Sequence, residues 1–355
     1  RPTLFDFLAH NALEFYTTDE NSITKPAYKF EIDNEQFLND AKSFSQLDIV
    51  SKDSTSLQLQ ALKLYQDLIQ FHVKDESPYA LADIDINRLL YVKQHATFSD
   101  IDTKLLETLK AESNRLKSHE VSALYDFEIA SLYIQQGSTY QPTINEEHRW
   151  KMKEAMALCD AVINKFSKSK GAEKCQVLKQ QILQKSLQIT AESHLPINKN
   201  SRLLIRYKNF DHLNLKVFHI SRNQLEKLNK TYRKEEQLAF INKLKVTKQW
   251  ESKLRDEHDY QTHSTEIVLP ELNNGYYVMF ASPDSDKEDS FAFATVQVTN
   301  MAIVDKSDAN HHIYQVIDRN NGQPISNAKV TLNYRRGNNT EQTEHKTTNT
   351  NGDIK

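Results

Sequence analysis

The stretch Thr190-Ala-Glu-Ser-His-Leu-Pro-Ile-Asn-Lys-Asn-Ser-Arg-Leu-Leu-Ile-Arg-Tyr-Lys208 joins two kinds of sequence. Before Pro196 the apolar residues recur at steps of three and four, which is the period of one helix face; they include Met152, Ala155, Met156, Cys159 and Val162. After Pro196 they alternate, as Leu203, Ile205 and Tyr207 do, which is the period of one strand face. Because the helical and strand segments are not interleaved, we predict separate domains, with a helical domain over 1–195 and an all-β remainder.

The helical domain is predicted to contain helices at 54–74, 100–136, 145–166 and 172–193, with weaker segments before and between them. The spacing of these helices loosely resembles that of tetratricopeptide repeats. Gly171 falls where a helical pattern ends, which predicts a helix C-cap there. The helices are expected to pack against each other as a scaffold.

The all-β remainder is predicted to form two β-sandwich domains. The first covers 197–303 and contains a polar, helix-leaning insertion at 222–258. The second starts at 304, and Asn321-Gly322 and Asn351-Gly352 predict hairpin turns in it. Its strand at 327–335 has one apolar face, and the residues up to Lys355 supply too few strands to cover that face. We therefore expect residues beyond Lys355, the first sandwich or a partner chain to complete this domain.

Composition excludes several classes of function. The 355 residues carry a net charge of -3 with both signs interspersed, which does not favour nucleic-acid binding. No apolar stretch approaches the roughly 20 residues that a membrane-spanning helix needs. The six glycines form no nucleotide-binding loop, and no nucleophile motif is present. We expect no catalytic residues, no cofactor and no enzymatic activity in this chain.

Three groups of residues are candidate sites. Cys159 and Cys175 lie on the apolar faces of neighbouring predicted helices, where they are either two buried thiols or a disulfide; the sequence favours buried thiols. His311-His312 cannot converge on one metal ion, because adjacent strand residues point to opposite faces. The acidic run at 284–289 lacks the glycine and the final acid of a calcium loop. No metal site is expected.

A family resemblance rests on the second β-sandwich. The pattern of Asp318, Asn321-Gly322, Pro324-Ile325, Ala328, Val330 and a second turn at Thr350-Asn351-Gly352 resembles the macroglobulin domains of alpha-2-macroglobulin-like proteins. The run from Ser201 to Ile220 looks like the opening strands of the preceding macroglobulin domain. The helices that start at Arg1-Pro-Thr-Leu-Phe-Asp-Phe-Leu are similar to the helical leader of large macroglobulin-like proteins from Bacteroidetes-type bacteria. Together these resemblances cover nearly the whole chain, as an N-terminal region.

The resemblance implies an exported protein, located in the periplasm or at the outer membrane or cell surface, that entraps or inhibits proteases. Many relatives use a thioester within Cys-Gly-Glu-Gln, but Cys159 and Cys175 are followed here by Asp160 and Gln176. The alternative is a non-inhibitory scaffold subunit of an envelope complex. Both expectations make other proteins the partners. Asp53-Ser54-Thr55 also resembles an O-glycosylation motif of such exported proteins, although a helix N-cap explains the same residues.

Overall fold

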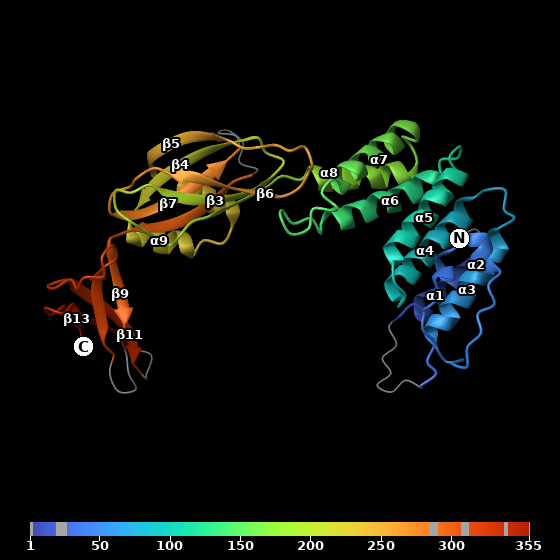
Figure 1. The fold of residues 1–355 in the computed structure, drawn as a ribbon, viewed down its shortest axis with the longest axis horizontal. Helices are drawn as coiled ribbons and strands as arrows, with labels where there is room; N and C mark the ends of the chain where they lie inside the picture. The colour runs from blue at the N-terminus through green and yellow to red at the C-terminus, as the bar shows by residue number, and fades with distance from the viewer. Residues whose placement is uncertain (1–2, 19–26, 284–289, 307–311, 337–339, 355) are drawn as a thin grey trace. The chain divides into compact units, whose positions relative to one another are not determined.

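The computed structural model describes residues 3–18, 27–283, 290–306, 312–336 and 340–354. The chain forms two compact units. The first contains Arg1–Gln184 together with the short segment His258–Gln261, and the second contains Lys185–Glu257 and Thr262–Lys355. Figure 1 shows helices α1 to α8 in the first unit and the β-sheets in the second.

Helices are the regular elements of the first unit, joined by turns and loops in its described residues. Its elements are α1 (Leu4–Tyr16), the 3-10 helix η1 (Glu35–Leu38), α2 (Ala41–Ser45), α3 (Leu57–His72), α4 (Tyr79–His95), α5 (Ile101–Arg115), α6 (Ser122–Gly137), α7 (Lys151–Lys165) and α8 (Lys170–Leu183). Each contributes apolar side chains to one continuous core. The prediction of a helical N-terminal part is confirmed, while its tetratricopeptide-like character stays a prediction.

The change from helix to strand comes earlier than the sequence predicted. The helix expected over 172–193 ends at Leu183, and strand β1 (Ser186–Thr190) pairs antiparallel with β3 (Ser201–Lys208). Leu187 and Ile189 alternate with polar residues and pack into the sandwich core, as a strand requires. The helical reading was wrong here because Ile182 and Ile189 are seven residues apart, a spacing that also fits one helix face.

A β-sandwich occupies most of the second unit. One sheet has the order β1-β3-β6, and the other has the order β2-β8-β7-β4-β5. The further strands are β2 (His194–Leu195), β4 (His212–Ile220), β5 (Lys245–Lys253), β6 (His263–Leu269), β7 (Gly275–Ser282) and β8 (Ala292–Val298). Alternating residues of both sheets meet in a shared core.

The segment expected as an insertion at 222–258 has two structural parts. Helices α9 (Arg222–Asn229) and α10 (Lys234–Ile241) supply apolar residues to a second core on the outer face of the five-stranded sheet. The rest of the segment forms β5, which pairs with β4 across a register shift at Val217/Phe218. The sheet is therefore covered on both faces, which explains why β7 is almost continuously buried.

The C-terminal β strands form two smaller sheets. Strand β9 (Met301–Asp305) pairs with β10 (Tyr314–Asp318), and β10 also pairs with β13 (Asp353–Ile354). Strands β11 (Lys329–Arg336) and β12 (Thr340–Thr347) form a separate antiparallel hairpin. Because β9 pairs with β10, residues 301–303 belong with these strands rather than with the first sandwich, where the sequence placed them.

Candidate functional site

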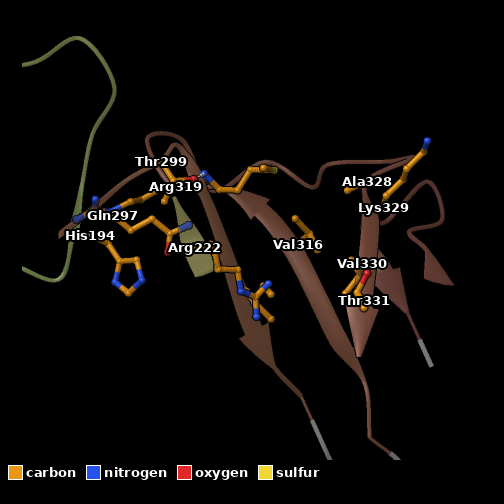
Figure 2. A pocket seen from close by; sticks show the side chains of 13 residues that line it. His194, Arg222, Gln297, Thr299, Val316, Arg319, Ala328, Lys329, Val330 and Thr331 are labelled. Atoms are coloured by element: carbon orange, nitrogen blue, oxygen red, sulfur yellow. Dashed lines mark hydrogen bonds between the residues drawn. The ribbon is translucent and has the colours of Figure 1, made fainter. Parts of the chain in front are cut away.

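A cleft of about 770 Å³ lies within the second unit, among the C-terminal strands and the end of the sandwich sheet that leads into them. Figure 2 shows it from close by. Its lining residues come from β2, α9, β8, β9, β10, β11 and the segments between them: His194, Arg222, Gln297, Thr299, Met301, Ala302, Ile303, Val316, Arg319, Ala328, Lys329, Val330 and Thr331.

One part of the cleft is apolar. Val316 on β10 is buried, and its register partner Ile303 on β9 is 61% exposed. Met301, also on β9, is 50% exposed, and Val330 on β11 is half-buried. Figure 2 shows Val316 and Val330 on two different strands that border the cleft. Apolar side chains of two separate sheets thus line this part of the cleft.

The other part of the cleft is polar and cationic. Figure 2 places His194, Gln297 and Arg222 together at the end opposite Ala328 and Val330. The Nη2 atom of Arg319 lies 3.5 Å from a carboxylate oxygen of Glu192, and Nε of Arg222 lies 3.3 Å from one of Glu226. Both side chains of the Arg222–Glu226 pair are more than half exposed, and the side chain of Arg319 is 32% exposed beside the exposed Glu192. Solvent screens both ion pairs, so either guanidinium group can exchange partners.

Two glycine turns fix the strands that border the cleft. Gly322 and Gly352 adopt φ angles of +73° and +74°, which residues with a Cβ atom rarely adopt. A Cβ atom on Gly352 would lie 2.5 Å from the carbonyl oxygen of Val316, so this glycine lets β13 approach β10. The chain turns at both Asn-Gly pairs, but only the glycine of each pair has a positive φ. The second turn is not the predicted hairpin, because β12 pairs with β11 whereas β13 pairs with β10.

The two cysteines are brought together by the structure. Cys159 on α7 and Cys175 on α8 are both fully buried and are not linked in this structure, and their thiols form a hydrogen bond with each other. The sequence predicted that the two cysteines lie near each other, but not that they are directly opposite. Both alternatives, two buried thiols or a disulfide, stay predictions.

Ser54 lies exposed in a turn before α3. The N-cap of α3 is Ser56, whose Oγ accepts a hydrogen bond from the backbone nitrogen of Leu59, so neither Ser54 nor Thr55 has that role. Asp53 is buried and accepts hydrogen bonds from the Phe30 backbone and the Thr55 hydroxyl. Glycosylation at Ser54 stays a prediction.

The other candidate groups yield no site among the described residues. The acidic run at 284–289 and His311 lie outside them, and the ring of His312 stacks on that of Tyr314. In the part of the chain that the structure describes, no cluster of three His, Cys, Asp or Glu side chains is placed to bind a metal ion. Within those same residues, no helix is both long and apolar enough to cross a bilayer.

Sequence reasoning missed the polar half of the cleft. Arg222 and Arg319 are separated by almost a hundred residues, and neither belongs to a local motif. The only local signal was the apolar alternation of the last strands, which predicted an uncovered face around Val330. The convergence of α9 with β9 and β10 depends on tertiary structure, which residue spacing does not encode.

Comparisons with known proteins give weak similarities. No family model and no curated protein matches the chain. A solved fragment of native alpha-2-macroglobulin from Escherichia coli is 14% identical with a TM-score of 0.35, and the match covers 48% of this chain and 56% of that one. A shorter fragment of the same protein is 13% identical with a TM-score of 0.34, over 48% of this chain and 86% of that one. A CARDB domain from Pyrococcus furiosus is 14% identical with a TM-score of 0.20, over 32% and 92%. Similarities of this extent assign neither a family nor a function to the chain.

Proposed function

We propose that this chain is a non-enzymatic part of an exported, macroglobulin-like protein that binds proteases and restrains them. The observation that carries the proposal is the cleft bordered by β9, β10 and β11, which presents apolar side chains and free strand edges to a protein partner. The sequence resemblance supplies the class of partner. The Bacteroidetes-type origin and the extracytoplasmic location belong to the same proposal.

The edges of the small sheets favour a protein partner over a small molecule. Strands β9 and β11 each lie at the edge of their described sheet, so one side of each backbone has no strand partner there. An extended peptide segment can add to such an edge through main-chain hydrogen bonds, with alternate side chains entering the apolar space. The cationic groups at the polar end, Arg222 and Arg319, suit a segment that also carries carboxylates.

Protease binding is tested with the purified chain and a panel of serine and cysteine proteases. We expect the chain to co-elute with a protease during gel filtration. We also expect cleavage of a large protein substrate to fall more than cleavage of a small peptide substrate. A bound protein blocks large substrates by steric exclusion, while small peptides still reach the active site. If no protease is retained and neither cleavage rate changes, the proposal is wrong.

A matched pair of variants tests the role of the cleft. Val330→Asp places a carboxylate in the apolar space and should abolish co-elution, because an unpaired charge is costly to bury. Asn333→Asp adds the same charge to the opposite, exposed face of β11 and should leave co-elution unchanged. Equal behaviour of the two variants would place the contact elsewhere on the chain.

The scaffold alternative is favoured by one observation in the helical unit. Helix α1 buries one face and leaves Leu4, Phe7, Leu8 and Phe15 between 55% and 72% exposed. Apolar side chains gathered on one exposed helix face are typical of protein interfaces. Here we propose an apolar helix of another envelope subunit as the partner. Replacing Leu8 and Phe15 by Lys should then release the chain from a large membrane-fraction assembly; unchanged sedimentation of that assembly would reject this alternative.

A further inference from the structure

The chain has only two cysteines among its 355 residues, and the fold places them in direct contact. Cys159 lies six residues before Lys165, where α7 ends, and Cys175 lies five residues after Lys170, where α8 begins. Helices α7 and α8 form an antiparallel hairpin, so these offsets put the two residues at nearly the same height. Both side chains are fully buried on the facing sides of the two helices.

In the folded unit the contact makes the two thiols unequal. The hydrogen bond from Cys175 lowers the pKa of the Cys159 thiol and outweighs the opposing effect of burial. The same hydrogen bond and burial both raise the pKa of Cys175. This mutual interaction supports the direct contact of the two side chains that the helix offsets indicate.

We propose that Cys159 and Cys175 are a disulfide-forming pair that links α7 to α8 when the protein matures in an oxidising compartment. In the living organism, formation of this disulfide rests on the extracytoplasmic location proposed above, because cytosolic thiols stay reduced. The pairing itself rests only on the contact between the two residues. The pair is a structural modification site in the helical unit.

The oxidant is a disulfide, either that of a thiol–disulfide oxidoreductase or oxidised glutathione. The thiolate of one cysteine attacks one sulfur of this disulfide and releases the other as a thiolate, which forms a mixed disulfide. The other cysteine loses its proton and attacks Sγ of the first, and the second sulfur of the oxidant leaves as a thiolate. Two protons and two electrons pass from the cysteines to the oxidant. Because both thiols are buried in the folded unit, exchange takes place while α7 and α8 are still assembling.

The link closes a loop of about 15 residues, which restricts the unfolded chain more than the folded one. Oxidation is therefore expected to raise the midpoint of thermal unfolding of the helical unit by about 6–12 °C. Reduction should reverse the shift without changing the helical content, because both thiols already fit side by side in the reduced fold.

The test uses the full chain, refolded in a buffer of oxidised and reduced glutathione. The protein is then unfolded in denaturant with an alkylating reagent and no reductant, and its intact mass is measured. We expect no alkyl adduct and a mass lower by two hydrogen atoms, with two adducts after prior reduction. Two adducts without reduction, or a glutathione adduct on each cysteine, would overturn the pairing.

Two single variants complete the test. Cys159→Ser and Cys175→Ser should each give one adduct, and reductant should leave their thermal midpoints unchanged. If either variant fails to fold, the wild-type chain with and without reductant still decides the matter, and equal midpoints overturn the stabilising link. The source compartment is tested separately. The pair could form a disulfide in glutathione buffer and yet be reduced in protein isolated from its cells. That result would contradict the extracytoplasmic location but not the pairing of the two cysteines.

Discussion

Arg88 shows how a single residue holds the helical unit together. Its guanidinium is fully buried, forms an ion pair with the equally buried Asp85, and donates to the backbone oxygen of Phe37 at 2.6 Å. It also lies over the ring of Phe44, 4.5 Å from its centre. The second carboxylate oxygen of Asp85 accepts a hydrogen bond from the Tyr125 hydroxyl. One polar cluster therefore connects η1, α2, α4 and α6 inside an apolar core.

Removing one member of this pair should be more costly than removing both. We expect Arg88→Ala or Asp85→Ala to lower the free energy of unfolding by about 3–5 kcal/mol, because each leaves a buried charge without its partner. The double variant Arg88→Met with Asp85→Leu should cost clearly less than the sum of the single changes. Urea unfolding followed by circular dichroism measures all three. Additive losses would show that the two charges act independently.

His72 is a buried titratable residue at the end of α3. Its Nε2 atom lies 2.6 Å from the buried carboxylate of Asp6 on α1, and its Nδ1 atom lies 2.7 Å from that of Asp75. Burial opposes the charged ring, but the hydrogen bonds to Asp75 and Asp6 outweigh it and raise the pKa of His72. Burial likewise opposes ionisation of Asp6, yet hydrogen bonds from His72 and Thr3 lower the pKa of that carboxyl.

These two shifts predict how stability depends on pH. The His72 contribution is complete below the unfolded-state pKa of 6.5 and is lost as pH rises through the raised folded-state value. The Asp6 contribution is present above 3.8 and is lost as pH falls through the lowered value. Stability from this cluster should therefore be highest between about pH 4 and 6.5 and should fall toward alkaline pH.

The variant His72→Gln should remove the alkaline part of this dependence. At about pH 6 it should cost roughly 2 kcal/mol, since a charge-assisted hydrogen bond is lost. The difference from wild type should shrink as pH rises. His148→Gln replaces a half-buried histidine of the same unit and serves as the control. Thermal unfolding across pH measures both; a His72→Gln deficit that stays constant across the alkaline range would contradict the assignment.

At the scale of elements, Gly171 decides how closely α8 approaches α6. A Cβ atom at this position would lie 2.4 Å from the backbone carbonyl carbon and oxygen of Ala123. The sequence suggested a helix C-cap here, but Gly171 is the second residue of α8, and Ser169 caps that helix by accepting a hydrogen bond from the Ala172 nitrogen. The glycine is needed for close helix packing rather than for a positive φ angle.

Gly171→Ala should therefore force the two helices apart and destabilise the helical unit by about 1–3 kcal/mol. Gly322→Ala provides a contrasting control, because a Cβ atom on Gly322 would meet no other atom within 4 Å and only its φ of +73° is strained. That change should cost about 1 kcal/mol and leave the helical transition unaffected. Chemical unfolding followed by the circular dichroism of the helices distinguishes the two variants. An unchanged transition in Gly171→Ala would mean that α8 shifts without cost to accommodate the added methyl group.

Periodicity predicted the types of element well and their ends poorly. The apolar face of α7 extends over several helical turns, and the alternation in β3 over several residue pairs. A pattern of that length fits only one of the two periods, so the type of element is predicted correctly. Residues 184–190 contain only Leu187 and Ile189 as apolar signals, and two residues fit either period. The pairing of β1 with β3 resolves the ambiguity, and that pairing depends on tertiary contacts.

At the scale of the whole molecule, the helical unit is built from two stretches of sequence that are not contiguous. The segment His258–Gln261 lies between β5 and β6 in sequence but belongs to the helical unit. The side-chain amide of Gln261 donates to the backbone oxygens of Gly137 at 3.0 Å and Arg149 at 3.1 Å. The carboxylate of Asp259 lies 2.9 Å from Nε of Arg149. No spacing in the sequence pointed to these contacts, because they join residues more than a hundred positions apart.

Because of these contacts, we expect a substitution at Gln261, which lies between two strands in sequence, to destabilise the helical unit. Gln261→Ala removes two hydrogen bonds, to the buried Gly137 oxygen and the part-buried Arg149 oxygen, and should cost about 1–3 kcal/mol. The two units have separate apolar cores, so calorimetry of the full chain should resolve separate transitions. Gln261→Ala should lower the midpoint of the transition that Arg88→Ala also lowers. Gln249→Ala, at an exposed position on β5, should shift neither. A Gln261→Ala effect confined to the other transition would show that 258–261 stabilises the sandwich instead.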